Sequence, residues 1–278
     1  MKEQVGLRGK AWFKALTGSD TPNHGDDPNS VLATTAAVGN ESALFLCVVP
    51  DKDSRFPCVR DGQVGLEEAF TLATHIRAVI AEDRDKPREA KRPIIAIVDV
   101  KSQAYGRREE TAGIFFAAAT SADAYASARM AGHPVISLVA GHAFSGGFLT
   151  HGYQANRILA FDDAGIVIHA MHKEAAARIT RRSVAELEKL GHEIPPMSYD
   201  VREYAKLGLL FKLLHADDPQ HSTSNEVAEV RRAITEAIAD ARKGKLDLSN
   251  RWESDAAKET RKGTLAVRAA LEAQWFNE

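Results

Sequence analysis

The sequence lacks three features that would mark a specialised class of protein: many cysteines, a charge excess of one sign, and a long apolar run. Its two cysteines, Cys47 and Cys58, form neither a CxxC pair nor the dense framework of small secreted domains. The 36 Lys and Arg nearly balance the 38 Asp and Glu, so no overall field attracts nucleic acid or an acidic membrane surface. No run approaches the roughly 18 apolar residues of a membrane span.

The N-terminal segment MKEQVGLRGKAWFKALTG also lacks the apolar core of about 7–15 residues that a signal peptide needs. Together with the scarcity of cysteine, this predicts a reducing compartment, and we expect the protein in the cytoplasm. With 44% hydrophobic and 27% charged residues, a chain of 278 residues can bury one large core without disulfides or metal. The composition therefore predicts one main globular domain.

Apolar runs that alternate with amphipathic segments predict an α/β fold. Runs 31–38 and 43–49, separated by a Gly–Asn turn, predict a hairpin, and runs 94–98 and 134–140 are typical of strands buried on both faces. Two shorter strands are expected at 157–161 and 166–169. The helical period predicts helices at 3–16, 65–81, 107–131, 145–155, 184–190, 199–214 and 227–241.

The chain divides into three predicted parts. Residues 1–30 are expected to form an N-terminal helix and linker, 31–214 the α/β domain, and 215–278 a helical extension. The charged tail from residue 251 carries apolar residues that have no obvious core to enter: Trp252, Leu265, Val267, Leu271, Trp275 and Phe276. We expect this tail to dock onto another subunit, with packing inside the chain as the alternative.

The most informative stretch is Gly141–Gly147, with the sequence GHAFSGG, between a predicted buried strand and a predicted helix. Such a turn presents unpaired backbone N–H groups at the positive end of a helix, where an anion or a developing oxyanion binds well. Gly146 and Gly147 would let a substrate carbonyl approach closely, because they carry no Cβ. The alternative is that the two glycines only permit tight packing of the helix on the strand.

A second loop of the same plan precedes it by about forty residues. The segment DVKSQAYGRREE again runs from a strand through a glycine-containing turn into a helix. In a crotonase-type fold, two such loops face one cavity, and each supplies one N–H to an oxyanion hole for a thioester enolate. An ordinary turn is the alternative for Gln103–Gly106.

Three long segments in order resemble the gamma subunit of biotin-independent malonate decarboxylase. They are VDVKSQAYGRREE, AYASARMAGHPVISLVAGHAFSGGFLTHGYQANRILAFDD and HAMHKEAAARITRRSVAELEKLG, and the resemblance runs from about Arg55 to Leu214. The chain is more distantly similar to the alpha half of acetyl-CoA carboxyltransferase. The resemblance implies a crotonase-like (ClpP/crotonase) α/β fold of repeated ββα units with a helical C-terminal extension.

The resemblance also implies a reaction and its partners. A malonyl thioester, carried on the phosphopantetheine-type group of an acyl carrier protein, would lose carbon dioxide and become the acetyl thioester, with no cofactor bound directly by this chain. The implied partners are a homologous beta subunit that shares the cavity, the carrier-protein subunit and an acyl-carrier-protein transferase subunit. The enolate left by the reaction needs a proton source and an oxyanion hole, each donor of which is worth roughly 3 kcal/mol.

The residue types suggest roles within this site. Gly146 and Gly147 would hold an oxyanion or a carboxylate through their N–H groups, and Ser145 would cap the helix and offer its hydroxyl. Tyr105 is a candidate proton source, although an aromatic residue after such a turn is more often a pocket wall. The facing loop would add Gly106 to the catalytic set. Expected substrate-binding residues are Gln103, Ala104, Phe144, Gln154 and His169.

Other polar residues give weaker signals. A proton shuttle is a legitimate role for any of His142, His151, His169 and His172, most of which we expect to be structural or exposed. Their spacing fits no HExxH or other metal pattern, so we predict no metal. The RITRR segment, Arg178–Arg182, could meet a phosphate or an acidic carrier protein, but a solvated helix end is slightly favoured.

A serine hydrolase of the Clp type is the main alternative function. Clp-type proteases share the crotonase-like architecture, and Ser145 precedes His169, with Asp217 and Asp218 further along the chain. This order fits a catalytic triad, but order does not establish geometry.

Two more alternatives stay open. An enoyl-thioester hydratase or isomerase would need carboxylates above the acyl chain, for which Glu109, Glu110 and Glu174 are the nearby candidates. The first two also begin a predicted helix, where the helix dipole favours acidic residues without any catalytic role. A noncatalytic scaffold that completes a partner's site is the third alternative.

Overall fold

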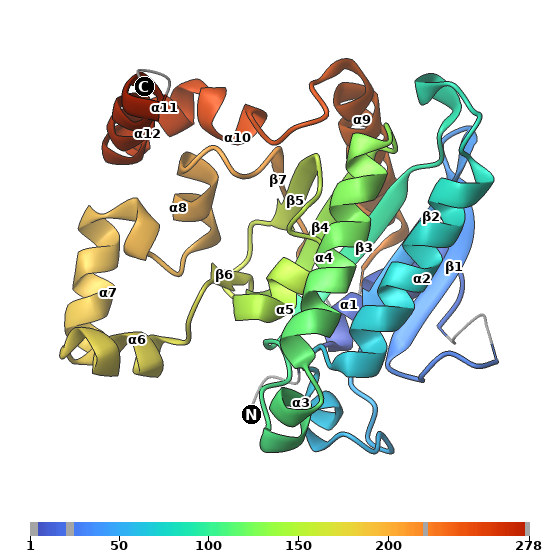
Figure 1. Cartoon of the computed structure of the whole chain (residues 1–278), viewed down its shortest axis with the longest axis horizontal. Coiled ribbons are helices and arrows are strands. Elements are labelled where there is room, and N and C mark those ends of the chain that lie inside the picture. Colours follow the sequence, from blue (N-terminus) through green and yellow to red (C-terminus); the bar gives the residue numbers. More distant parts are fainter. Residues whose placement is uncertain (1–4, 21–24, 219–221, 276–278) are drawn as a thin grey trace.

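A seven-stranded sheet forms the centre of the molecule (Figure 1). The computed structural model describes residues 5–20, 25–218 and 222–275. The strand order is β1-β2-β3-β4-β5-β7, with β6 paired to the far end of β4. The first two strands form the predicted antiparallel hairpin, and all other pairs are parallel. The strands are β1 (Val31–Val38), β2 (Glu41–Val48), β3 (Ile94–Val100), β4 (Val135–Phe144), β5 (Arg157–Phe161), β6 (Val167–His169) and β7 (Lys212–Leu214).

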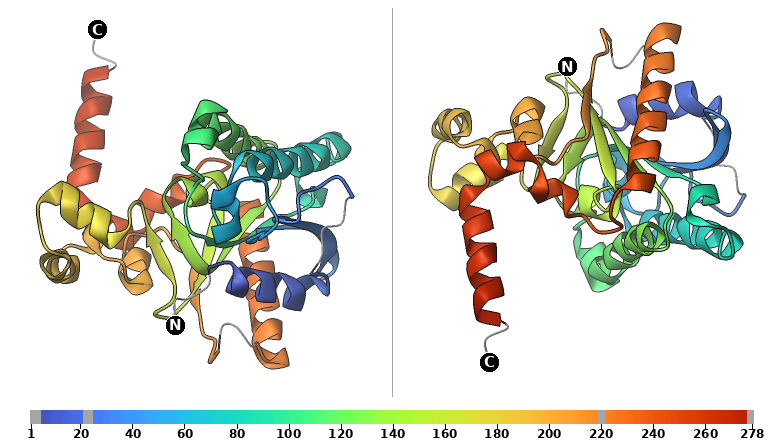
Figure 2. Two further views of the ribbon diagram at one scale, coloured as in Figure 1. Left: turned by 90° about the horizontal axis from the view of Figure 1, so that it is seen from below. Right: turned by 90° about the horizontal axis from the view of Figure 1, so that it is seen from above.

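Helices cover both faces of this sheet, as the buried runs of β3 and β4 require. Helices α2 (Leu66–Glu82) and α4 (Ile114–Met130) pack against each other on one face. Helices α1 (Leu7–Thr17) and α9 (Ser224–Lys243) pack on the opposite face, as the end-on views show (Figure 2). The predicted mixed α/β class is thereby confirmed.

Two predicted elements around the glycine-rich turn have different lengths in the structure. Strand β4 continues through Phe144, because its last three residues pair with β6. The helix that follows, α5 (Ser145–Thr150), ends well before the predicted Ala155, since His151 already has extended backbone angles and Gly152 has a φ of 97°. Similarly, the predicted helix 107–131 is split by Gly113, with a φ of 87°, into α3 (Arg107–Thr111) and α4.

The predicted helix at 199–214 was wrong for its second half. Helix α8 (Val201–Lys206) stops before Gly208, which has a φ of 76°, and β7 then adds an edge strand beside β5. An amphipathic period in this stretch did not reveal the break, because leucines suit a buried edge strand as well as a helix. Nearby lie α6 (Lys173–Thr180) and α7 (Val184–Glu193), and short 3₁₀ helices cover Pro57–Asp61, Arg88–Ala90 and Pro195–Met197.

The C-terminal segment runs through α10 (Asn250–Glu253), α11 (Asp255–Thr260) and α12 (Lys262–Trp275). Helix α12 projects away from the body of the molecule and buries none of its residues (Figure 2). Helices α1 and α9, by contrast, contribute Trp12, Phe13 and Ile234 to the same core as the sheet. The division of the chain into three parts stays a prediction. Within the described segments, no helix combines the length and apolar character needed to cross a membrane.

A buried carboxylate joins α1 to the sheet. Asp99, on β3, is only 2% exposed and accepts hydrogen bonds from the backbone N–H groups of Gly6 at 2.8 Å, Gly9 at 3.1 Å and His142 at 3.0 Å. A Cβ on Gly141 would lie 2.2 Å from its Oδ1, so the glycine makes room for the carboxylate. Asp99 therefore holds the N-terminal helix, β3 and the end of β4 in one arrangement.

Replacement of Asp99 by Ala should remove the acceptor of three backbone N–H groups at once, two of them in buried hydrogen bonds. Because hydrogen bonds to a charged group contribute about 1.5–3 kcal/mol each and unsatisfied buried donors are costly, we expect a loss of at least about 3 kcal/mol in the free energy of unfolding, measured by urea titration. Asp123→Ala is the control, since its ion pair with Arg77 is exposed and should matter by less than about 0.5 kcal/mol. Equal stability of the two variants would contradict this role.

Candidate active site

The two predicted loops lie against each other at the ends of β3 and β4. Val100 is aligned with Ala143 in the parallel register, so the residues after each strand emerge side by side. The backbone N–H of Gly146 donates to the side-chain Oε1 of Gln103 at 3.0 Å. A backbone donor of one loop is therefore already directed at an amide oxygen of the other.

The two glycines of the turn have different roles. A Cβ on Gly147 would lie 2.5 Å from the carbonyl carbon of Ser102, a backbone atom that cannot move aside cheaply. A Cβ on Gly146 would instead meet the side-chain end of Gln103 at 2.8 Å. Tight packing thus explains Gly147, whereas the space beside Gly146 is filled only by a flexible side chain.

Ser145 is strained rather than capping. It is the first residue of α5, its φ is +54°, and the N-cap position belongs to Phe144, without a side-chain cap. A non-glycine residue in this left-handed region costs on the order of 1–3 kcal/mol and is frequent at functional turns. The expected helix-capping role of Ser145 was wrong, because Ser145 is the first helical residue and not the N-cap.

Two cavities meet at Gly146 and Leu149. The first, which we name the His169 cavity, has a volume of about 280 Å³. The second, the α4 cavity, has about 290 Å³ and lies between α4 and α5. The His169 cavity is lined by Ala143, Ser145, Gly146, Phe148, Leu149, Tyr153, Ile168, His169, Ala170, Tyr204 and Leu209. The α4 cavity is lined by Gln103, Glu110, Ile114, Phe115, Ala118, Ala119, Ala122, Gly146, Leu149 and Thr150.

Of the predicted site residues, Gln103, Ser145, Gly146 and His169 therefore line the two cavities. The other predicted residues line neither cavity. Sequence patterns missed Tyr153 and Tyr204 in the first cavity and Phe115 in the second, where Glu110 was considered only for the hydratase alternative. No local motif marks the three missed residues as neighbours, since the helices that carry Tyr204 and Phe115 are brought to α5 only by the fold.

The remaining residues of the Gln103–Gly106 loop line neither cavity. Tyr105 is 57% exposed, and the N–H of Ala104 is used by the carbonyl of Val64 at 2.8 Å. Gly106 is the N-cap of α3 and lies against the buried Glu109 carboxylate. The free N–H that a facing loop was expected to supply is therefore absent from Ala104 in this arrangement.

Phe144 and Gln154 also stand apart from the cavities. Phe144 is buried, with its ring centroid 4.1 Å from that of His172 and 5.7 Å from that of His142. The main-chain carbonyl and side-chain Oε1 of Gln154 both face the Arg129 guanidinium, at 3.1 and 3.4 Å. These contacts give both residues packing roles in the chain.

His151 is a core histidine. It is fully buried, with Nδ1 2.9 Å from the Tyr125 hydroxyl and Nε2 2.9 Å from the Ile97 carbonyl. Burial lowers its pKa to about 4, although the bond to the carbonyl acts in the opposite direction. Both ring nitrogens are thus used, and the ring is neutral near pH 7.

This shift predicts acid sensitivity. The unfolded chain takes up a proton near pH 6.5, while folded His151 does so only near its pKa of about 4. Stability should therefore fall as pH decreases between these values, by up to about 1.4 kcal/mol per pH unit for this group. We expect His151→Gln to lose that part of the slope in urea unfolding at pH 6 and pH 5. An unchanged slope in the variant would show that other groups cause it.

The triad of the hydrolase alternative is not assembled. Nδ1 of His169 lies near the backbone of Met171 and not near a carboxylate. Asp217 forms an exposed ion pair with His215, at 2.9 Å. Among the carboxylates of the hydratase alternative, only Glu110 lines a cavity at Gly146. Among the described residues, no group of three or more His, Cys, Asp or Glu is arranged to hold a metal ion.

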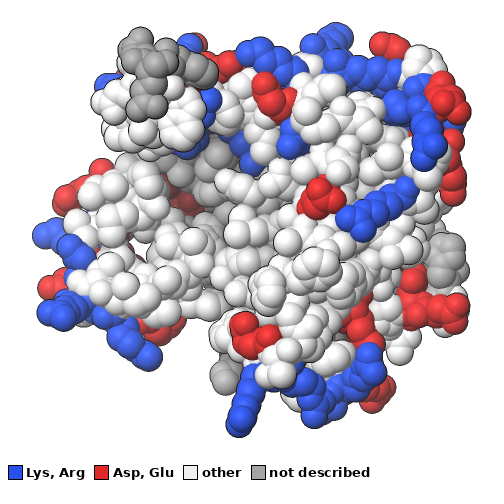
Figure 3. Space-filling model, viewed as in Figure 1, with Lys and Arg blue, Asp and Glu red and all other residues white. Residues whose placement is uncertain are grey.

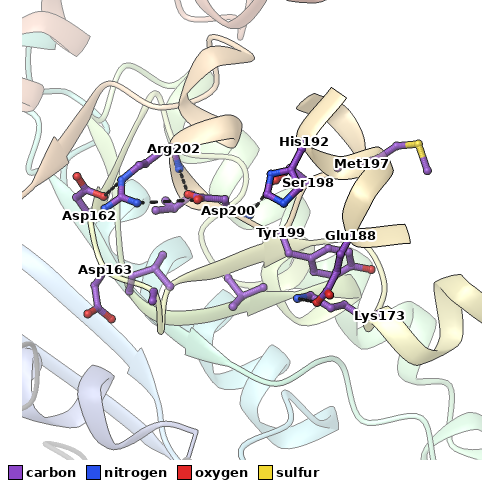
Figure 4. Close-up of a pocket in the computed structure, with 15 residues that line it drawn as sticks. Asp162, Asp163, Lys173, Glu188, His192, Met197, Ser198, Tyr199, Asp200 and Arg202 are labelled. Carbon is purple, nitrogen blue, oxygen red and sulfur yellow. Dashed lines mark hydrogen bonds and ion pairs between the residues drawn. The ribbon is translucent and has the colours of Figure 1, made fainter. Parts of the chain in front are cut away.

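A third cavity, of about 360 Å³, lies beside α7 and α8 and contains none of the predicted site residues (Figure 4). Arg202 lies between Asp162, at 2.6 Å, and Asp200, at 4.0 Å. Lys173 pairs with Glu188 on the opposite wall at 2.7 Å. Because these charges compensate each other, the cavity offers no clear preference for an anion or a cation.

Similarity to solved structures defines the class of protein. A chain of transcarboxylase 12S, in its structure with methylmalonyl-coenzyme A and methylmalonic acid bound, has a TM-score of 0.61 at 19% identity, over 88% of this chain and 44% of that chain. Together with the parallel sheet, this similarity supports the crotonase-like α/β fold that the sequence resemblance implied.

More similar proteins define the family. Residues 59–275 match the family described as malonate decarboxylase gamma subunit. A chain of a Pseudomonas malonate decarboxylase hetero-tetramer in complex with coenzyme A is 48% identical, with a TM-score of 0.89 over 96% of this chain and 99% of that chain. A chain of the Pseudomonas MdcD–MdcE hetero-dimer is 47% identical, with a TM-score of 0.87 over 96% of this chain and 99% of that chain. Malonyl-S-ACP:biotin-protein carboxyltransferase MADD of Malonomonas rubra is 32% identical over 254 residues, 90% of this chain and 85% of the relative.

The chain therefore belongs to the malonate decarboxylase gamma subunit family. The predicted enzyme class, a lyase acting in malonate decarboxylation as one subunit of a heteromeric complex, is confirmed.

Proposed function

We propose that this chain, in the cytoplasm and paired with a beta subunit, decarboxylates a malonyl thioester at Gly146 without using biotin. The observation that carries this proposal is the hydrogen bond from the Gly146 N–H to the Gln103 amide oxygen. That oxygen is a carbonyl-type acceptor like a thioester oxygen, and its donor, Gly146, lines both cavities. A substrate oxygen that displaced it would accept the same N–H.

The reaction makes one demand that this N–H can meet. The bond between the carboxylate carbon and the α-carbon breaks, carbon dioxide leaves, and the electron pair moves onto the thioester oxygen as an enolate. A preorganised donor at that oxygen stabilises the transition state by roughly 3 kcal/mol. The left-handed turn at Ser145 fixes the direction of the following N–H, so little reorganisation is needed.

The two cavities give the thioester two directions in which to extend. With its carbonyl at Gly146, the malonyl group would enter the His169 cavity, whose walls carry a hydroxyl, phenols and an imidazole. The phosphopantetheine-type arm of the carrier protein would lie in the α4 cavity, which is lined mostly by apolar residues. Carrier protein and acyl-carrier-protein transferase are accordingly part of the proposed complex.

A side chain added at Gly146 tests the proposed binding of the thioester oxygen there. In the purified complex with the beta subunit, Gly146→Val should lower kcat for carbon dioxide release from malonyl-carrier-protein by about 100-fold or more, because the side chain occupies the oxygen position. Gly25→Val is the matched control, since nothing lies within 4 Å of a Cβ there. Full activity of an assembled Gly146→Val complex would refute the site, and an inert wild-type complex would refute the reaction.

Transfer of the carboxyl group to biotin is the second candidate, because the Malonomonas rubra relative is a biotin-protein carboxyltransferase. Both reactions share the enolate and differ in the fate of the carboxyl group. The Pseudomonas relatives, at 46–48% identity, support direct decarboxylation more strongly than the 32% relative supports transfer. Release of carbon dioxide in the presence of excess avidin separates the two.

This chain has an exposed apolar surface beside the α4 cavity that would suit the beta subunit. Phe115 is 73% exposed and Phe116 63% exposed on α4, and Leu149 is 52% exposed on α5. Uncharged side chains fill the middle of this face (Figure 3). The apolar face of α12, with Val267, Leu271 and Trp275, offers a second contact at the other end of the molecule. Docking on the first face would close the α4 cavity.

A charge on this face should weaken assembly. Phe115→Lys replaces an exposed apolar ring, so the free chain should keep its stability, whereas the complex should lose at least about tenfold in affinity if the face is buried there. Analytical ultracentrifugation of the pair measures the effect. Ile179→Lys on α6 is the control, because that side chain is 68% exposed and lines neither cavity. Equal affinities would place the interface elsewhere.

A further inference from the structure

The enolate at Gly146 needs a proton, and among the described residues the cavities that meet there contain one histidine. His169 ends β6, where it is aligned with Phe144 of β4, the residue directly before Ser145. Its ring lines the same cavity as Ser145 and Gly146. The pairing of β6 with the last residues of β4 therefore brings an imidazole to the turn that carries the N–H donor.

The other histidines of this region are held elsewhere. Both ring nitrogens of His151 are used within the core. His142 has its Nδ1 3.8 Å from the Asp99 carboxylate and stacks on Phe144. His172 lies against the other side of that cluster, with its ring on Phe144, and lines neither cavity.

Three other candidate acids, Tyr105, Tyr204 and Glu110, are less suitable. Tyr105, the acid considered from the sequence, is exposed and lines neither cavity. Tyr204 does line the His169 cavity, but burial raises the pKa of its phenol well above the ordinary value, which weakens it as a proton donor. Glu110 lies across α5, in the α4 cavity.

The contacts of His169 suit a group that gains and loses a proton. Its Nδ1 lies 3.1 Å from the N–H of Met171 and 2.9 Å from the carbonyl of the same residue. Unprotonated Nδ1 can therefore accept from the N–H, and protonated Nδ1 can donate to the carbonyl. Tyr199 stacks on the ring at a centroid distance of 3.8 Å, and its hydroxyl donates to that carbonyl at 2.7 Å. With Nδ1 held in this way, Nε2 is the nitrogen left for the cavity.

We propose that His169 is the catalytic acid that protonates the α-carbon after carbon dioxide has left. This inference rests on the proposed decarboxylation at Gly146. As the enolate collapses, its electron pair takes the proton from Nε2 of the imidazolium, a carbon–hydrogen bond forms, and the ring becomes neutral. The ring, which is only partly buried, then regains a proton from water, so that one proton is consumed for each carbon dioxide released.

The test measures proton transfer separately from decarboxylation. The acetyl thioester of the carrier protein, incubated with the complex in D₂O, exchanges its methyl hydrogens through the same enolate and the same acid. In the assembled complex, His169→Gln should lower both carbon dioxide release and methyl exchange by at least about 100-fold, with KM little changed. Added imidazole should restore part of both rates to His169→Ala. His172→Gln is the control and should keep both rates.

Each outcome bears on one of the two proposals. If His169→Gln keeps release and exchange within about threefold of the wild type, or only raises KM, His169 is not the acid. The site at Gly146 is tested separately by Gly146→Val. If imidazole restores neither rate to His169→Ala while that complex assembles normally, the acid role also fails. A wild-type complex that shows neither release nor exchange would overturn the decarboxylation itself, and the His169 assignment with it.

Discussion

The three backbone N–H groups that converge on the buried Asp99 carboxylate fix the geometry on which the candidate site depends. Gly6 and Gly9 come from the start of α1, and His142 comes from β4, only three residues before Ser145. The cluster requires glycine at 141, where a side chain would collide with the carboxylate. Because Asp99 fixes the backbone at His142, the chain can keep Ser145, three residues later, in a strained conformation.

The strained residue, Ser145, directly precedes the proposed donor, Gly146. At Ser145 the chain reverses from strand to helix within one left-handed residue, which presents the Gly146 N–H to the space between the two cavities. Gly147 lets the new helix lie directly against the Ser102 backbone, where a Cβ would be only 2.5 Å from the carbonyl carbon. Packing therefore explains Gly147, whereas Gly146 carries the proposed binding role.

Patterns in the sequence predicted the sheet, both layers of helices and the pairing of the two loops, because buried runs and glycine turns are local signals. They located Gly146, Ser145, Gln103 and His169 for the same reason. They missed Tyr153, Tyr204 and Phe115 and misplaced Tyr105 and Gln154, because the direction of a side chain depends on contacts with distant segments. The edge strand β7 was missed since its leucines also fit a helix. Helix α8, which carries Tyr204, was therefore predicted to run too far.

The bond between Gly146 and Gln103 also bears on why a subunit of this kind would work in a complex. In the isolated chain the donor is already satisfied, so a substrate oxygen must exchange with the Gln103 amide and gains only the difference between the two bonds. That difference grows when the oxygen becomes an enolate, because a charged acceptor binds an N–H more strongly than a neutral amide does. A partner that covered Phe115 and excluded water from the α4 cavity would increase it further. Under the proposed mechanism, the arrangement would therefore favour the transition state over the bound substrate, most of all in the assembled complex.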